Sequence, residues 1–348
     1  MAIIGITDAM WKNILPFIAR PQLGLNLSLV SHQFDLLVDN QFDSTELINL
    51  DVLMVCRLFP CTVPAIAIIQ HTSIRNKTKS PLLAGPLRQN IRFTTLSISF
   101  LDRDVIAFLN ANHQLFDRGI ALRLYGCYPR PELIWDMVVQ QMWPILSTLT
   151  IRNFQIDEAQ INILRRRISP TLLTDLTNLE SIWCSGLLPD AVGDDEANAT
   201  AAQALSKWLH TPSAGGRPKQ LRCRYTNEET FSNWVDKFKQ AFTSATTSVS
   251  FSLLILGWCV TAARRIRPFE LVNEQTQERL TFEKTTVNTA HLKKMVNLER
   301  PSDSWLMKRR PIGDETILQN ALNFDQLSLD HLCTVELEFA APSCFGYF

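Results

Sequence analysis

Hydrophobic side chains recur along the chain with two different periods, one of which predicts helices and the other strands. Residues 6–43 carry apolar side chains at spacings of three and four, and we expect three short helices there. The first begins at Thr7 or Asp8, which are good N-caps, and Pro16 should end or kink it. The second begins at Pro21, since proline is tolerated in the first helical turn. These helices carry more apolar surface than a three-helix unit can bury, so one face should dock onto a neighbour.

Downstream of residue 90, alternating apolar and polar residues predict strands, and amphipathic stripes between them predict helices. The expected strands are 96–100, 120–124, 149–151, 179–182, 221–225 and 249–255. The expected helices lie around 105–109, 134–138, 161–168, 205–209 and 231–242. Such alternation of strands and helices predicts an α/β fold.

The expected strands recur at uneven intervals of about 26–39 residues, which overlap the 20–29-residue period of leucine-rich repeats. The LxxLxLxxN signature is absent, so we expect an irregular, leucine-rich-repeat-like strand–helix solenoid. A compact doubly wound sheet is the alternative, but its glycine-rich strand–helix turn is missing. After residue 264 the rhythm changes. Residues 269–282 should form a β-hairpin with NEQTQE as its loop, while 305–307 and a strand near 335–339 should close a C-terminal β-rich cap.

Composition narrows the range of functions. The 348 residues include 34 basic and 34 acidic side chains, a formal net charge of +0. Proteins that bind bulk nucleic acid or anionic lipid normally have a basic surplus, so we expect neither nucleic acid nor a membrane as a partner. No signal peptide is recognisable at the start, and the apolar segments 52–69 and 249–263 are interpreted as buried core. We expect a cytoplasmic or nuclear protein.

Linear motifs for catalysis, cofactors or metals are missing from the sequence. The 8 Cys include no CxxC pair, which favours free, buried thiols over a zinc site, and neither HExxH nor GxSxG occurs. The six His are interpreted as surface or capping residues. The acidic run 194–196 is interpreted as a solvated loop, with a divalent-cation site as the alternative. Residues 165–167 are arginines that should end a helix, with phosphate reading as the alternative. We therefore expect no catalytic residue, cofactor or metal.

Residues 6–43 resemble an F-box, the module through which substrate receptors of SCF ubiquitin ligases dock onto a Skp-type adaptor. Ile14-Leu15 stands at the I-L pair of the family, Leu29-Val30-Ser31 at its L-V-S run, and Phe34 at its Trp or Phe. The chain departs from the pattern at Thr7, where the family usually has Pro, and at Ala9, where it usually has an acidic residue. The resemblance implies adaptor contacts from Ile6, Thr7, Met10, Ile14, Leu15, Leu23, Leu29, Val30 and Phe34.

Later segments resemble an expanded nematode family of F-box proteins, among them NIRFTTLSISFLDRDVIAFL and RPFELVNEQTQERLTF. The resemblance implies a non-catalytic receptor that recruits an unknown protein substrate for ubiquitination, with the adaptor and the cullin of an SCF complex as partners. The expected domains are an F-box-like helical domain at 5–43, a connecting segment at 44–90, an α/β repeat-like substrate-recognition domain at 91–263 and a C-terminal hairpin or cap region at 264–348.

Two other functions stay open on the sequence alone. In the first, the F-box-like helices only cap the solenoid of a non-catalytic protein-binding scaffold, and the Thr7 departure favours this alternative. In the second, the chain is an enzyme whose catalytic groups assemble in space without a linear motif. An enzyme of that kind needs a deep pocket with convergent titratable groups.

Overall fold

The computed structural model describes residues 48–54, 65–70, 78–81, 91–98, 103–117, 119–124, 135–213, 216–225, 228–257, 267–285 and 304–313. The chain divides into two compact units, Met1–Thr150 and Ile151–Phe348. The helices expected over 6–43 and the strand expected near 335–339 lie outside the described residues. The predicted domain boundaries at 43, 90 and 263 stay predictions.

The described strands of the first unit form a sheet in the order β3-β2-β1-β4-β5. They are β1 (Ile48–Met54), β2 (Ala65–Gln70), β3 (Thr78–Pro81), β4 (Ile91–Ile98) and β5 (Ile120–Leu124). The pairs β1–β2 and β2–β3 are antiparallel, whereas β1–β4 and β4–β5 are parallel. The 52–69 segment, expected to be buried core, thus contributes to two strands.

Strand β3 falls inside the span 72–90, whose Pro, Thr, Ser and Lys content is typical of a linker. Its four residues, Thr-Lys-Ser-Pro, pair with β2 through the backbone. Sheet hydrogen bonds use backbone groups, so a short outer strand needs no apolar alternation. Composition alone therefore could not identify this strand.

Helices of the first unit supply the aromatic part of its core. They comprise α4 (Arg103–Asn112), the 3₁₀ turn η3 (His113–Phe116), the π-helical turn η4 (Val138–Met142) and α6 (Trp143–Leu146). Phe93 of β4 contacts Phe116 and Phe108 at ring-centroid distances of 4.9 and 6.4 Å. All three rings are almost completely buried, and rings at such distances stabilise a core beyond the area they remove from water.

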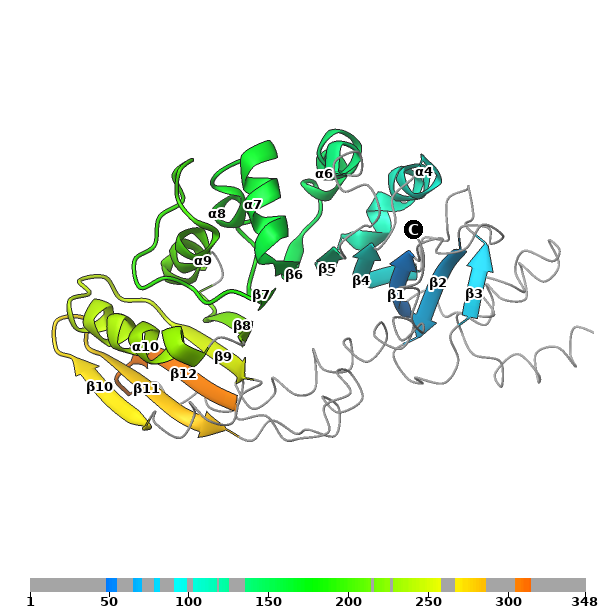
Figure 1. Ribbon diagram of the computed structural model, residues 1–348. Coiled ribbons are helices and arrows are strands. Elements are labelled where there is room, and N and C mark those ends of the chain that lie inside the picture. Colours follow the sequence, from blue (N-terminus) through cyan, green and yellow to red (C-terminus); the bar gives the residue numbers. More distant parts are fainter. Residues whose placement is uncertain are drawn as a thin grey trace, which may run out of the picture. The chain divides into compact units, whose positions relative to one another are not determined.

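The second unit begins with four parallel strands that alternate with helices (Figure 1). The strands are β6 (Ile151–Asp157), β7 (Ser181–Ser185), β8 (Lys219–Tyr225) and β9 (Phe251–Gly257). The helices are α7 (Glu158–Arg167), α8 (Leu172–Asp175), α9 (Ala201–His210) and α10 (Glu228–Thr243). Both α7 and α9 begin at a capping box, Asp157 with Gln160 and Thr200 with Gln203, which satisfies backbone donors of the first turn.

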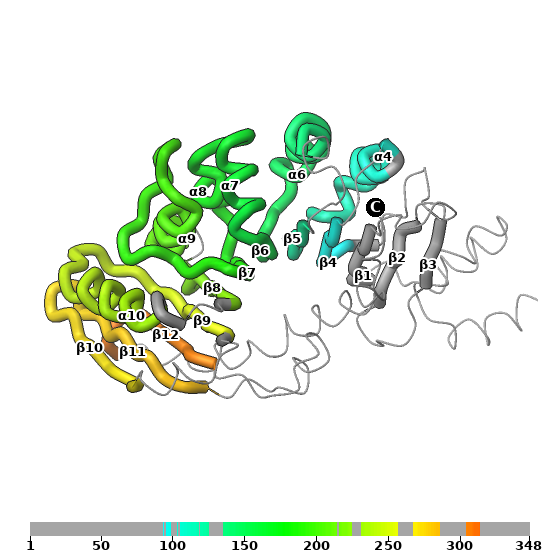
Figure 2. The backbone as a smooth tube through the Cα atoms, viewed as in Figure 1, coloured from blue at the N-terminus to red at the C-terminus, as the bar shows by residue number. Residues whose placement is uncertain are grey.

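Three antiparallel strands complete the sheet of the second unit, in the order β6-β7-β8-β9-β12-β11-β10. They are β10 (Phe269–Asn273), β11 (Glu278–Thr285) and β12 (Ser304–Pro311). The predicted hairpin over 269–282 is confirmed, with a turn over residues 274–277. The 305–307 segment belongs to β12, which lies between β9 and β11 and pairs with both (Figure 2). The predicted α/β class is thus confirmed for the described residues.

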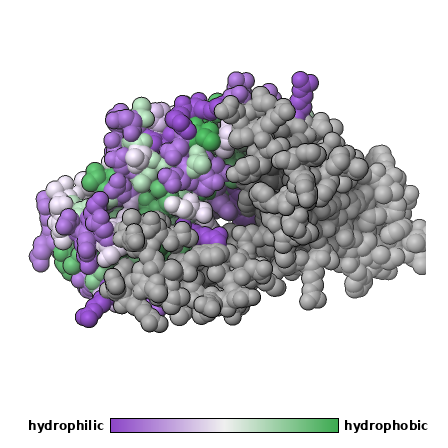
Figure 3. Space-filling view, in the orientation of Figure 1, coloured by the Kyte–Doolittle hydropathy of each residue, from purple (hydrophilic) through white to green (hydrophobic). Residues whose placement is uncertain are grey.

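The described helices of the second unit form one layer. Trp208 and His210 of α9 contact Lys219 and Phe251, and Phe231 of α10 contacts Phe282. The strand register places Lys219, Phe251 and Phe282 on one side of the sheet, while α7 and α8 adjoin α9. The outer surface of this layer is mainly hydrophilic, with isolated hydrophobic residues, in the view of Figure 3. No helix in the described ranges is long and apolar enough to cross a bilayer.

Two cysteines face each other in the core on neighbouring strands. Cys184 of β7 and Cys223 of β8 are register partners, free thiols and fully buried, as the sequence predicted for the cysteines. Burial raises the pKa of the Cys184 thiol to about 12, with a smaller contribution from Asp157, and burial raises the pKa of Cys223 well above its ordinary value. Because the thiolate is the reactive form, both thiols should be inert in the folded protein.

We expect iodoacetamide at pH 8 to leave Cys184 and Cys223 unmodified in the native protein and to label both in urea. Peptide mapping by mass spectrometry resolves them from the other cysteines. Native labelling of either residue at the rate seen in urea would contradict the buried positions of both side chains.

Candidate functional site

The side chains expected to bind an adaptor lie outside the described residues. They are Ile6, Thr7, Met10, Ile14, Leu15, Leu23, Leu29, Val30 and Phe34. A candidate site is therefore sought among the described charged clusters and on the sheet of the second unit.

Arg165, considered for phosphate reading, is instead a structural residue. Its side chain is buried at 5 % exposure and donates hydrogen bonds to the carbonyl oxygens of Pro170, Glu196 and Ala199. Burial lowers the pKa of Arg165, while Asp195 and Asp194 oppose that shift. A guanidinium committed to three carbonyls has little left for a phosphate, so the phosphate-reading alternative is wrong for this residue. Residues 165–167 do end α7, as predicted.

The acidic run 194–196 is held in a fixed loop between β7 and α9. The carboxylate of Asp195 accepts a hydrogen bond from Thr174, and that of Asp194 accepts one from the Glu196 backbone. At Gly193 a Cβ would lie 2.6 Å from the backbone nitrogen of Lys207, so only glycine fits against α9 there. Over the described residues, no three His, Cys, Asp or Glu side chains are placed to share a metal ion.

Lys219 is a titratable residue that sequence reasoning missed. Its Nζ donates to the Trp208 carbonyl at 2.6 Å and lies 4.9 Å from the Trp208 ring centroid. The lysine thereby stabilises a carbonyl in the last turn of α9, where positive charge is favourable. Burial lowers the pKa of Lys219 to about 8. The only sequence signal was a basic residue that follows a helix at the start of a strand.

His210, the last residue of α9, lies against this same core. Its ring is 5.4 Å from Phe251 and 6.0 Å from Phe238, and its Nδ1 is 2.9 Å from the Ser206 carbonyl oxygen. Burial lowers the pKa of His210, although the Ser206 carbonyl opposes that shift. The capping interpretation fits this residue, whereas exposed His113 lies at the surface as expected.

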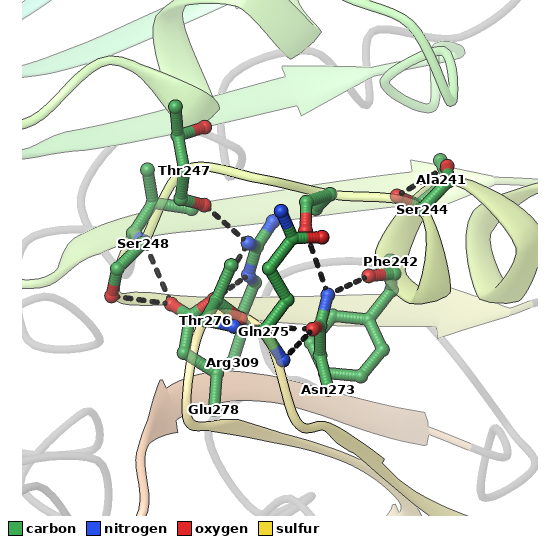
Figure 4. Close-up of polar contacts among 12 residues, drawn as sticks. Ala241, Phe242, Ser244, Thr247, Ser248, Asn273, Gln275, Thr276, Glu278 and Arg309 are labelled. Carbon is green, nitrogen blue, oxygen red and sulfur yellow. Dashed lines mark hydrogen bonds and ion pairs between the residues drawn. The ribbon is translucent and has the colours of Figure 1, made fainter.

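A buried ion pair joins β11 and β12 (Figure 4). Glu278 is 0 % exposed and accepts two hydrogen bonds from Arg309, at 2.7 and 3.1 Å. The other Glu278 oxygen accepts from the Val249 backbone and the Ser248 hydroxyl, and Arg309 also donates to the Thr247 carbonyl. Burial alone would raise the pKa of Glu278, but the Arg309 contacts outweigh it, so the pKa lies below its usual value.

Asn273 extends this cluster to the end of α10. Its amide nitrogen donates to the carbonyls of Phe242 and Ala245, and its oxygen accepts from the backbone of Gln275 and Thr276 (Figure 4). The cluster therefore ties helix, loop and hairpin together through charges that are already satisfied. Its chemistry is that of a structural clamp rather than of a catalytic centre.

The other side of the second-unit sheet is the helix-free face, by which we mean the side chains on β6–β12 that alternate with those packed against the helix layer. Its centre is a row across neighbouring strands, Trp183, Arg222, Leu254 and Leu306, each the register partner of the next. Leu254 and Leu256 form an apolar cluster on which Trp183 and Leu306 pack, both of them half-buried. Leu254 and Leu256 are 8 % exposed and Arg222 is 6 % exposed, so the centre of this face is buried rather than an open surface.

Comparisons with known proteins do not identify a functional site in this chain. No protein-family model matches the chain, and neither the curated proteins nor the solved structures provide a match.

Proposed function

We propose that the chain is a non-catalytic substrate receptor of an SCF-type ubiquitin ligase. Residues 5–43 form the F-box-like helical domain, which docks onto a Skp-type adaptor and through it onto the cullin. The observation that carries the proposal is the run Ile14-Leu15, followed by Leu29-Val30-Ser31 and Phe34 at the F-box spacing. The receptor works in the cytoplasm or the nucleus.

Adaptor docking is driven by apolar burial in this proposal. Each aliphatic side chain taken out of water contributes about 1.5–3 kcal/mol before the costs of association. We propose that six apolar side chains form a helical surface that binds in a groove of the adaptor, namely Ile6, Met10, Ile14, Leu15, Leu29 and Val30. The receptor itself breaks no bond; it raises the effective concentration of its target near the transferring enzyme.

The downstream chain presents the target. We propose that residues 91–263 are an irregular, leucine-rich-repeat-like solenoid and that 264–348 form its cap. The alternation of β6–β9 with α7–α10, with these helices in one layer, supports this architecture. Repeat proteins bind partners through extended surfaces, and this is the role that we propose for these residues.

The experiment is co-purification of a tagged full-length chain carrying Ile14→Asp with Leu15→Asp. We expect capture of adaptor and cullin to fall at least about tenfold, because two charges in an apolar groove remove several kcal/mol of binding. The matched control is Val192→Asp with Ile312→Asp, at positions 67 % and 44 % exposed, which should retain both proteins. Equal capture by wild type and the Ile14/Leu15 variant would refute adaptor docking through these residues.

The scaffold alternative has one observation in its favour, the departure at Thr7. It predicts that the chain's own residues protect Ile14 and Leu15. Hydrogen exchange of the isolated protein separates the two functions, since slow exchange at 14–15 without adaptor supports the scaffold.

A further inference from the structure

A serine followed by proline, Ser169-Pro170, stands just after the arginine run that ends α7. Proline-directed protein kinases transfer phosphate to a Ser or Thr that precedes Pro. The chain has three such pairs, Ser80-Pro81, Ser169-Pro170 and Thr211-Pro212. A phosphate adds charge and hydrogen-bond acceptors at one point, so its effect depends on the contacts that the hydroxyl already makes.

The three pairs differ in the residues that flank the hydroxyl. Ser80 belongs to β3, whose backbone pairs with β2. Thr211 directly follows α9, whose last turn includes the buried Trp208. Before Ser169, by contrast, residues 166 and 167 are exposed, and Ser169 itself is half-buried. A kinase must contact the chain on both sides of the acceptor hydroxyl, so Ser169 is the favoured site of the three.

The hydroxyl of Ser169 helps to close the turn between α7 and α8. It donates to the carboxylate of exposed Asp175 at 2.9 Å, and the Thr171 hydroxyl donates to the same oxygen at 2.9 Å. The Ser169 oxygen also accepts a hydrogen bond from the Thr171 backbone at 3.2 Å. Helix α8 is a single turn whose N-terminus has no side-chain cap, and a helix this short is marginally stable alone. The turn over residues 169–175 therefore depends on these side-chain contacts.

The same turn is tied to the loop that precedes α9. The Pro170 carbonyl accepts from Arg165, whose guanidinium also donates to two carbonyls of that loop. From α8, the Thr174 hydroxyl donates to the Asp195 carboxylate at 2.9 Å. A displacement of residues 169–175 therefore removes contacts that hold residues 195–199.

A phosphate on Ser169 would lie beside a carboxylate and a helix C-terminus. It carries about −1.5 to −2 charges at pH 7, and the hydroxyl hydrogen that Asp175 binds is lost. The C-terminal end of α7 adds a partial negative charge of its own. Arg165 is committed to backbone carbonyls and Arg166 donates to the Asn162 carbonyl, so both guanidinium groups already have other partners. Repulsion from Asp175 should therefore decide the outcome.

We propose that Ser169 is the acceptor of a proline-directed protein kinase and that its phosphate opens the turn over residues 169–175, which releases the loop before α9. In the transfer, the Ser169 oxygen bonds to the γ-phosphorus of ATP while the bond from that phosphorus to the bridging oxygen breaks. ADP leaves, and the hydroxyl proton passes to a carboxylate base of the kinase. The inference is independent of the proposed receptor function.

The first test treats the purified full-length chain with an active mitogen-activated protein kinase and ATP, and locates phosphate by peptide mass spectrometry. We expect phosphate on Ser169. Pro170→Ala keeps the hydroxyl and the backbone carbonyl, and it should slow incorporation at residue 169 at least about tenfold, because these kinases select their substrates by the residue after the acceptor. The matched control, Pro212→Ala at an exposed position, should leave that rate unchanged. Absence of phosphate on Ser169 in wild type, or equal rates for all three proteins, overturns the inference.

The second test compares digestion of phosphorylated and untreated protein by endoproteinase Glu-C, which cleaves after glutamate. We expect cleavage after Glu196 to be at least about tenfold faster in the phosphorylated protein, because repulsion between the phosphate and Asp175 raises the population of the opened turn. Kinase-treated Ser169→Ala is the control, and it should be cleaved there at the same rate as untreated Ser169→Ala. An unchanged rate in wild type that carries phosphate on Ser169 overturns the proposed release of the loop.

Discussion

Arg309→Met lowers the free energy of unfolding by about 3–5 kcal/mol, because it leaves the Glu278 carboxylate buried without its cation. The carboxylate is fully buried, and its other hydrogen bonds, from the Val249 backbone and the Ser248 hydroxyl, come from neutral donors. Methionine fills a similar volume, so the loss reports the charge rather than a cavity. Urea denaturation followed by far-UV circular dichroism measures the change.

Arg310→Met is the matched control for this substitution. Arg310 is the next residue of β12, but it lies half-buried on the opposite face. Its loss should cost within about 1 kcal/mol, as for a surface ion pair. Equal destabilisation by the two variants would mean that the Glu278–Arg309 pair contributes nothing specific to folding.

The pH dependence of the free energy of unfolding provides a second test of the Glu278–Arg309 ion pair. In wild type the pKa of Glu278 is lower in the folded than in the unfolded protein. The contribution of this carboxylate to the free energy of unfolding is therefore present above the unfolded-state pKa and is lost as the pH falls through the folded-state pKa. Without Arg309, burial dominates and the pKa of Glu278 should rise above the unfolded value. The contribution then reverses sign, and the variant should lose less stability than wild type on acidification.

Arg165→Met is the second substitution with a large expected effect, a loss of about 2–4 kcal/mol, because three carbonyls lose a charged donor. These carbonyls belong to Pro170, Glu196 and Ala199, so the variant should also loosen the loop before α9. Urea denaturation measures the stability. Limited proteolysis should show new cleavage between residues 189 and 200.

The neighbouring Arg166→Met serves as the control for Arg165→Met. Arg166 is exposed and donates to the Asn162 carbonyl of its own helix, so we expect a change within about 0.5 kcal/mol and an unaltered cleavage pattern. If Arg165→Met is equally mild, the loop is held by its other contacts and the guanidinium is dispensable.

Local pattern was sufficient to predict several elements of this sheet. Strand β5 has the bounds that its alternation predicts, 120–124, and β8 and the β10–β11 hairpin fall where expected. Errors arose where an apolar residue belongs to a neighbouring turn. Leu149 was assigned to a strand, but its N–H donates to Leu146 in the turn after α6. Val249 is also buried, but it precedes β9, and its backbone N–H donates to the Glu278 carboxylate.

Long-range contacts account for what the sequence could not predict. Glu278 and Arg309 are separated by 31 residues, as are Arg165 and Glu196, and neither pair leaves a local signature. The helix-free face depends on the register of seven strands, which alternation within one strand cannot specify. The expected adaptor-binding residues, by contrast, rest on the sequence pattern of residues 6–43 alone.

The interior position of β12 has a consequence for biosynthesis. The β9 strand and the β10–β11 hairpin are synthesised well before residues 304–311, yet among the described strands β9 and β11 are each paired with β12 and not with each other. The edges of β9 and β11 that pair with β12 therefore lack hydrogen-bond partners in the nascent chain until β12 is synthesised. Unpaired strand edges can pair with strands of other molecules. A premature stop before residue 304 should thus yield aggregates rather than a shortened but otherwise intact sheet.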